Sequence, residues 1–104
     1  MNLKILPKDR ILDISLNLAR VGNWSADSYD RKKDLIRRFL NQTENYVSEI
    51  RIDSLSPEVK TVFTRFKIEF DKLKNQEISL ENKNEWAEKA LTWANILQHR
   101  AKLA

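Results

Sequence analysis

Apolar residues recur every three or four positions in four stretches of the chain, and short polar segments separate these stretches. This spacing places the apolar side chains on one face of an α-helix, because a helix turns once in about 3.6 residues. We therefore predict four helices. They cover approximately residues 7–21, residues 25–51, residues 57–74 and, starting between Ser79 and Asn82, a last stretch to about residue 101.

Local residue types mark the ends of these helices. Pro7 suits a first turn, where its missing N–H would have no partner, and Gly22 indicates a C-terminal stop. Ser25 or Asp27 is expected to cap the second helix by accepting a hydrogen bond from its first turn. The Ser-Pro-Glu segment at 56–58 combines a cap, a proline and an acid near the positive end of the helix dipole, and it is the clearest start signal.

The chain has only one Gly and two Pro, so it lacks the residues that the many turns of a β-sandwich or barrel require. An all-α fold follows, and four helices joined by short connections favour an antiparallel four-helix bundle. Residues 1–104 are expected to form a single domain, because smaller pieces could not bury a useful core.

The first predicted helix carries more apolar surface than one neighbouring helix can cover. Its apolar residues form two adjacent stripes, with Ser15 and Gly22 between them. Because both of these side chains are small, another helix can approach closely there. The first stripe consists of Ile11, Ile14, Leu18 and Val21, and the second of Leu12, Leu16 and Ala19.

The excess apolar surface predicts self-association. Large exposed apolar patches are uncommon on monomers and usually mark interfaces, and identical chains most often form a two-fold dimer. Alternatively, the N-terminal Leu3, Ile5 and Leu6 fold back over the second stripe within one chain. We expect a homodimer or other homo-oligomer whose interface includes Leu12, Leu16, Ala19, Ile68 and Leu91.

The absence of Cys excludes disulfides, thiolate metal sites and a Cys nucleophile, and it fits a reducing compartment. The first six residues hold too few apolar positions for a signal peptide. No apolar run approaches the ~20 residues that cross a bilayer. We therefore expect a cytoplasmic protein that binds no membrane, metal or cofactor.

Positive charge points to a second class of partner. The net charge is +4, and residues 31–38 contain five cations in eight positions. On a helix, four of these cations can face solvent together, close to aromatic residues that precede them. Cations neutralise phosphates and aromatic rings stack on unpaired bases, so we consider an RNA or single-stranded DNA site. Its residues would be Arg20, Trp24, Tyr29, Arg31, Lys33, Arg37 and Arg38; the alternative is a solvated helix face.

Catalytic motifs are missing. The only imidazole is His99, no Ser elbow or Gly-rich phosphate loop is present, and the Asp30 and Asp34 carboxylates are spaced for ion pairs with nearby cations. A phosphorelay bundle needs one exposed His, but a solvated His99 near a helix C-terminus is the simpler interpretation. We expect no enzyme.

Two classes of function therefore compete. The first is a non-enzymatic adaptor that self-associates and binds a macromolecular partner, and the second is an accessory protein that binds RNA or single-stranded DNA. Salt separates them, because phosphate contacts weaken steeply with salt whereas apolar association does not.

Overall fold

The computed structural model describes residues 5–104, and over this range it contains helices and no strand. The helices are α1 (Pro7–Glu49), the short 3₁₀ helix η1 (Ile52–Ser54), α2 (Pro57–Asn75) and α3 (Lys83–Ala101). The all-α prediction is confirmed. Leu3 lies outside the described residues.

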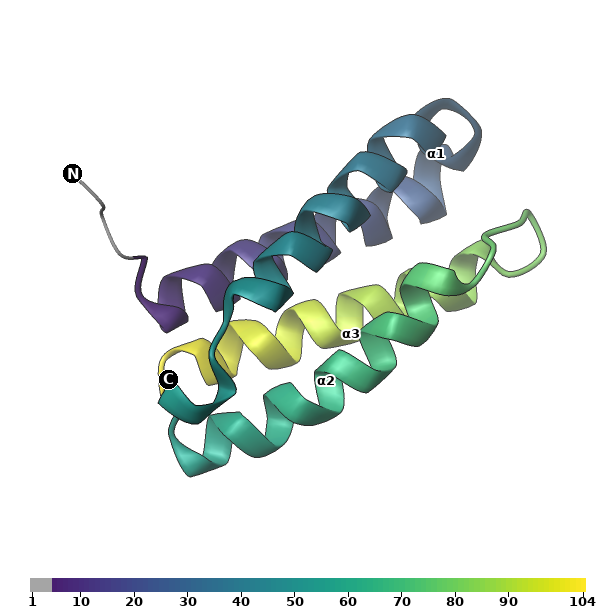
Figure 1. Ribbon diagram of the computed structural model, residues 1–104. Coiled ribbons are helices and arrows are strands. Elements are labelled where there is room, and N and C mark those ends of the chain that lie inside the picture. Colours follow the sequence, from purple (N-terminus) through teal and green to yellow (C-terminus); the bar gives the residue numbers. More distant parts are fainter. Residues whose placement is uncertain (1–4) are drawn as a thin grey trace.

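Helix α1 is interrupted at Ser28, whose backbone is not helical (φ −145°, ψ 34°). The chain reverses there, so that residues 7–27 and 29–49 form two arms of α1, here called arm 1 and arm 2, which lie side by side (Figure 1). Residues near the start of arm 1 contact residues near the end of arm 2. Nε of Arg10 lies 2.9 Å from the Glu49 carboxylate, the Asn17 amide donates to Gln42 at 3.0 Å, and the Trp24 ring meets Phe39.

The predicted stop at Gly22 is wrong. Arm 1 continues through Gly22, which is buried and helical, and no glycine in the described chain has a positive φ. The predicted caps, Ser25 and Asp27, both lie within arm 1, and the break falls at Ser28. Over the described residues the structure therefore has three α-helices, so the predicted bundle of four separate helices is not confirmed.

Arm 1 and α3 approach each other closely at the two small residues that the sequence singled out. The Ser15 hydroxyl donates a hydrogen bond to the Ala94 carbonyl at 2.6 Å. A Cβ atom placed on Gly22 would lie 2.8 Å from Cγ of Leu91 and 3.3 Å from the Ala87 carbonyl oxygen. The predicted close approach of another helix to Ser15 and Gly22 is confirmed.

Helix α2 meets the rest of the protein through large side chains. Phe63, Phe66 and Phe70 are buried, and the Phe66 ring lies 5.4 Å from the Trp93 ring, measured between centroids. The buried Trp86 indole donates to the Leu73 carbonyl at 3.0 Å. Trp93 itself is only half-buried.

The ends of α2 agree with the prediction, but Ser56 does not cap the helix with its side chain. Its hydroxyl instead donates to the Leu103 carbonyl at 2.9 Å. The C-terminal segment therefore lies beside the start of α2, and Figure 1 shows the C-terminus next to η1. No helix in residues 5–104 has the length and apolar character needed to cross a membrane.

Candidate functional site

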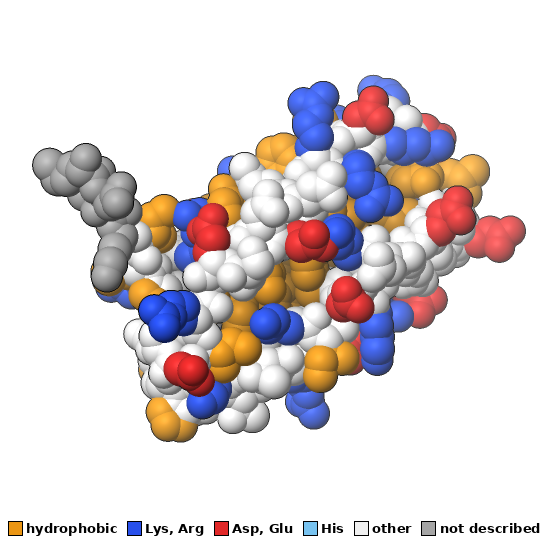
Figure 2. All heavy atoms as spheres, in the orientation of Figure 1, with side chains coloured by type: hydrophobic (Ala, Val, Ile, Leu, Met, Phe, Trp, Pro, Cys, Tyr) orange, Lys and Arg blue, Asp and Glu red, His pale blue; other side chains and the backbone are white. Residues whose placement is uncertain are grey.

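Arm 2 presents the basic segment 31–38 to solvent. Arg31, Lys33, Arg37 and Arg38 are exposed, and Lys32 is half-buried. Within residues 5–104 none of these five side chains forms an ion pair with a carboxylate. Figure 2 shows Lys and Arg side chains gathered near the end of the molecule where α1 reverses, with acidic side chains among them. This end of arm 2 therefore holds cations whose charge is not neutralised by a direct partner.

The aromatic residues beside these cations are occupied within the protein. Trp24 is half-buried and meets Phe39 edge-on, with the ring centroids 5.1 Å apart, while the Lys32 ammonium lies 5.6 Å from the Trp24 ring. The Tyr29 hydroxyl donates to the Ile78 carbonyl, and the Lys33 ammonium lies 5.2 Å from the Tyr29 ring. The predicted cluster of aromatic and basic residues exists, but its rings are not open platforms for a base.

Arg20 lies at the junction of the two arms. Its guanidinium donates to the Asn17 side chain at 3.2 Å and lies 5.7 Å from the Phe39 ring. Arg20 and Trp24 therefore both contact the Phe39 ring, so the structure places these two residues of the predicted nucleic-acid site next to each other. Arg20 is exposed, and its charge adds to that of the basic segment.

A hollow of about 550 Å³ lies between arm 2 and the loop that follows α2. Lys33 and Arg37 line it from arm 2, and Glu77 faces them from the loop. Asp34 also reaches its wall. With both signs of charge at its edge, this hollow is a mixed surface rather than a dedicated phosphate site.

The five residues of the predicted oligomer interface lie on three elements. On arm 1, Leu12 and Leu16 are 38% and 53% exposed, and Ala19 is half-buried against the core. On α3, Leu91 is half-buried and packs over Gly22. On α2, Ile68 is 58% exposed. The described residues Ile5 and Leu6 are both more than half exposed, so the alternative that they cover the second stripe of arm 1 has no support.

Hollows line both flanks of α3. One of about 460 Å³ lies on the side of arm 1 and is lined by Ala26, Leu91 and Ile96. Another of about 650 Å³ lies on the side of α2 and is lined by Ile68, Trp93 and again Ile96. Ile96 is the residue that the sequence reasoning missed. It lies beside Thr92, at the edge of the polar face that also carries Asn95 and His99, and an apolar side chain next to a polar face could have indicated a surface contact.

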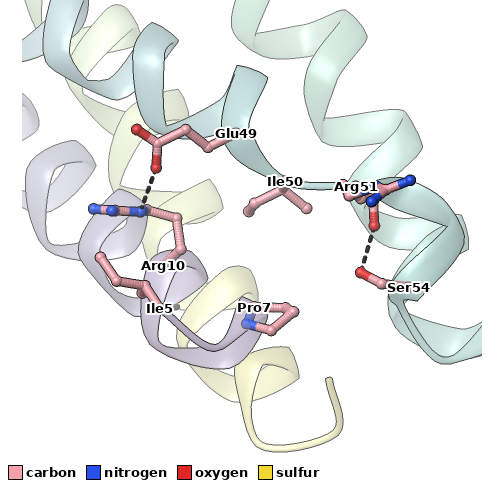
Figure 3. Close-up of a pocket in the computed structure, with 7 residues that line it drawn as sticks. All are labelled: Ile5, Pro7, Arg10, Glu49, Ile50, Arg51 and Ser54. Carbon is pink, nitrogen blue, oxygen red and sulfur yellow. Dashed lines mark hydrogen bonds and ion pairs between the residues drawn. The ribbon is translucent and has the colours of Figure 1, made fainter. Parts of the chain in front are cut away.

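A fourth hollow lies near the start of arm 1, between Ile5, Pro7 and Ile50 (Figure 3). Arg10 reaches its wall, but its guanidinium is held by Glu49 and Asp13 and lies 4.2 Å from the Tyr46 ring. Two carboxylates neutralise its charge. Arg10 therefore joins the two arms of α1 and is not available to an anionic ligand.

His99 is exposed in the last turn of α3, as expected. Among the described residues, no three His, Asp or Glu side chains come together in a way that would hold a metal ion. No family model, no curated protein and no solved structure matches the chain.

Proposed function

We propose that this protein is a non-enzymatic helical adaptor that self-associates through exposed apolar side chains and binds a macromolecular partner. The observation that carries the proposal is the exposure of Leu16 and Ile68, each by more than half, on faces that no other element of the described chain covers. Exposed apolar surface of this kind usually marks an interface when it is contiguous. Two copies of one chain cover it with a single two-fold contact.

In this proposal the protein is an antiparallel four-helix bundle of one domain, in which the two arms of α1 count as separate helices. The contacts of Arg10 with Glu49 and of Asn17 with Gln42 support opposite directions for the arms. Such a bundle offers rigid outer faces, and rigid faces lose little conformational entropy when they bind. The chain has no Cys, which fits a cytoplasmic location.

Light scattering tests the proposal. At tens of micromolar the protein should have about twice the 12.3 kDa mass of the single chain. Leu12→Glu with Leu16→Glu should reduce that mass if arm 1 is the interface. Circular dichroism of the variant must show unchanged helicity. A wild-type protein that stays at 12.3 kDa under these conditions would reject self-association.

A second function, binding of RNA or single-stranded DNA, is favoured by one specific observation. Arg31, Lys33, Arg37 and Arg38 are exposed and have no ion-pair partner in the part of the chain that the structure describes. Since Trp24 and Tyr29 are engaged internally, such binding would use phosphates rather than bases. We therefore expect weak affinity without sequence preference and with steep salt dependence.

A gel shift with single-stranded DNA at low salt tests this second function. Changing the four cations Arg31, Lys33, Arg37 and Arg38 to Gln should abolish the shift. The matched control changes Lys60, Lys67, Lys72 and Lys89, four exposed cations elsewhere, and removes the same net charge. A shift lost equally in both variants would indicate only the overall charge of the protein, and no shift in the wild type would reject the function.

A further inference from the structure

The outer face of α3, defined here by Glu85, Glu88, Thr92, Ile96 and Arg100, is a ridge between hollows. Thr92 lines the 460 Å³ hollow on the side of arm 1 and a smaller hollow of about 290 Å³ beside Trp93. Ile96 lines the 460 Å³ hollow and the 650 Å³ hollow on the side of α2. A ridge flanked by hollows has the shape that another helix can pack against, because ridges of one helix fit grooves beside another.

The hollow on the side of α2 is lined by both apolar and polar side chains. Its apolar lining consists of Val62, Ile68, Trp93 and Ile96, of which Ile68 is the most exposed. Its polar lining consists of Thr61, Thr64, Arg65, Glu69 and Arg100. Protein interfaces usually combine apolar and charged side chains in this way.

Charge is distributed unevenly along the ridge. Glu85, Glu88 and Lys89 occupy its N-terminal half, Arg100 lies at its C-terminal end, and Lys102 follows just beyond α3; all five are exposed. Glu85 has only an exposed ion pair with Lys89 at 3.3 Å, which contributes little. Arg100 and Lys102 have no ion pair within residues 5–104. Because Lys89 offsets Glu85, Glu88 is the carboxylate in excess at the N-terminal half, whereas the C-terminal end is basic.

From this distribution we propose that two copies of the protein pack α3 against α3 in antiparallel orientation. The two-fold axis lies between the two helices, at the level of residue 94 along each of them. Glu88 and Arg100 are twelve residues apart, about 18 Å along the helix. Rotation about an axis at their midpoint places the acidic end of each copy beside the basic end of the other. Thr92 and Ile96 then meet at the centre. The inference rests on the proposed self-association and names its face, partner and orientation.

The parallel arrangement of the same ridges is disfavoured by charge. It would place Glu88 beside the same residue of the second copy and Arg100 beside its own counterpart. Like charges at close range oppose association, whereas opposite charges favour it. The acidic and basic ends therefore select the antiparallel dimer from the two possibilities.

A pair of charge-reversed variants tests this geometry. Variant A carries Glu85→Lys and Glu88→Lys, and variant B carries Arg100→Glu and Lys102→Glu. The ridge of A is basic along its whole length and that of B is acidic. Each variant alone should dissociate more than about tenfold more readily than the wild type, because each loses opposite-charge pairs and gains like-charge ones. An equimolar mixture of A and B should restore the dimer.

The control for variant A carries Glu58→Lys and Glu81→Lys, two exposed residues that line none of the hollows beside α3, and it should dimerise like the wild type. Light scattering and native mass spectrometry measure the masses, and circular dichroism checks the helicity. Ile96→Glu should also dissociate the dimer.

The outcomes separate this inference from the proposed function. A wild-type protein that remains monomeric overturns both. If the wild type dimerises but A and B do so equally well, or their mixture restores nothing, the α3 face is wrong while self-association stands. Loss of the dimer in the variant with Leu12→Glu and Leu16→Glu alone would then assign the interface to arm 1.

Discussion

Helix α3 packs against arm 1 and against α2 in two different ways. On the side of arm 1 the contact is made at the small residues Ser15 and Gly22, and the Ser15 hydroxyl reaches the Ala94 carbonyl directly. On the side of α2 the contact is made by rings, with Phe66 against Trp93 and the Trp86 indole against the Leu73 carbonyl. The separation of packed helices depends on the side chains between them, so small residues allow a closer approach than rings do.

The two contacts are therefore sensitive to opposite changes. At the close contact there is no room for added atoms, because even a methyl group on Gly22 would meet Leu91 and the Ala87 carbonyl. At the aromatic contact the rings fill the space, and their removal would leave a cavity. Adding volume on one side of α3 and removing it on the other should thus both destabilise the fold.

The largest effect is expected from emptying the aromatic contact. Phe66 is fully buried, so Phe66→Ala should lower the free energy of unfolding by about 3 to 5 kcal/mol. Urea denaturation measures the change. Trp93→Ala is the comparison, and because Trp93 is half-buried it should cost less than Phe66→Ala. A loss below about 1 kcal/mol for Phe66→Ala would mean that the ring does not fill the core as described.

The next effect is expected from filling the close contact. Gly22→Leu should lower the free energy of unfolding by about 1 to 3 kcal/mol, the usual range for an overpacked site. Asn23→Leu, at the adjacent exposed position, should change it by less than about 0.5 kcal/mol. Leu91→Ala added to Gly22→Leu should recover part of the loss, because Leu91 is the nearest obstacle. If Gly22→Leu is as stable as the wild type, the approach of arm 1 to α3 is looser than the structure describes.

Gly22 also shows where sequence reasoning succeeded and where it failed. The prediction that a helix approaches closely at Ser15 and Gly22 is confirmed, because it needed only the helical period and the size of the side chains. The prediction that Gly22 ends the first helix is wrong. In proteins a glycine can end a helix or allow the close approach of another backbone. Only the position of α3 shows that Gly22 does the second.

Helix ends set by local chemistry were predicted better than those set by packing. Pro57 starts α2 as expected, since a proline fits only the first turn of a helix. The reversal at Ser28 has no such unique signal, because Ser25, Asp27 and Ser28 all favour non-helical backbone. The hydroxyl of Ser56 pairs with Leu103, 47 residues away in the chain, and nothing local indicates that bond.

The same difference, between features set by local sequence and features set by packing, applies to the candidate surfaces. The helical period correctly placed Arg31, Lys33, Arg37 and Arg38 in solvent. It could not show that Trp24 packs against Phe39, because that contact joins two arms whose pairing depends on the reversal at Ser28. The exposure of a single residue can thus be predicted from the period of its own helix. The contacts of an aromatic ring and the lining of a hollow depend on how several helices pack together.

A smaller effect is expected from the single hydrogen bond that crosses the close contact. Ser15→Ala removes the donor to the Ala94 carbonyl while keeping the small size that the contact needs. It should lower the free energy of unfolding by about 1 kcal/mol, the typical net contribution of such a bond. Thermal or urea denaturation measures the change. An increase in stability would show that steric fit alone, and not this bond, holds arm 1 to α3.

The smallest expected effect has the opposite sign and concerns a second buried serine of arm 1. Ser25 is fully buried, yet its hydroxyl has no hydrogen-bond partner among the described residues. A buried hydroxyl without a partner destabilises the folded state, and alanine is also the better helix former. Ser25→Ala should therefore raise the free energy of unfolding by a few tenths to about 1 kcal/mol. Ser15→Ala is the matched control, because the same change in the same arm should lower stability where the hydroxyl is paired. If both substitutions shift the urea midpoint in the same direction, hydrogen bonding does not distinguish the two serines, and the close contact is governed by side-chain volume alone.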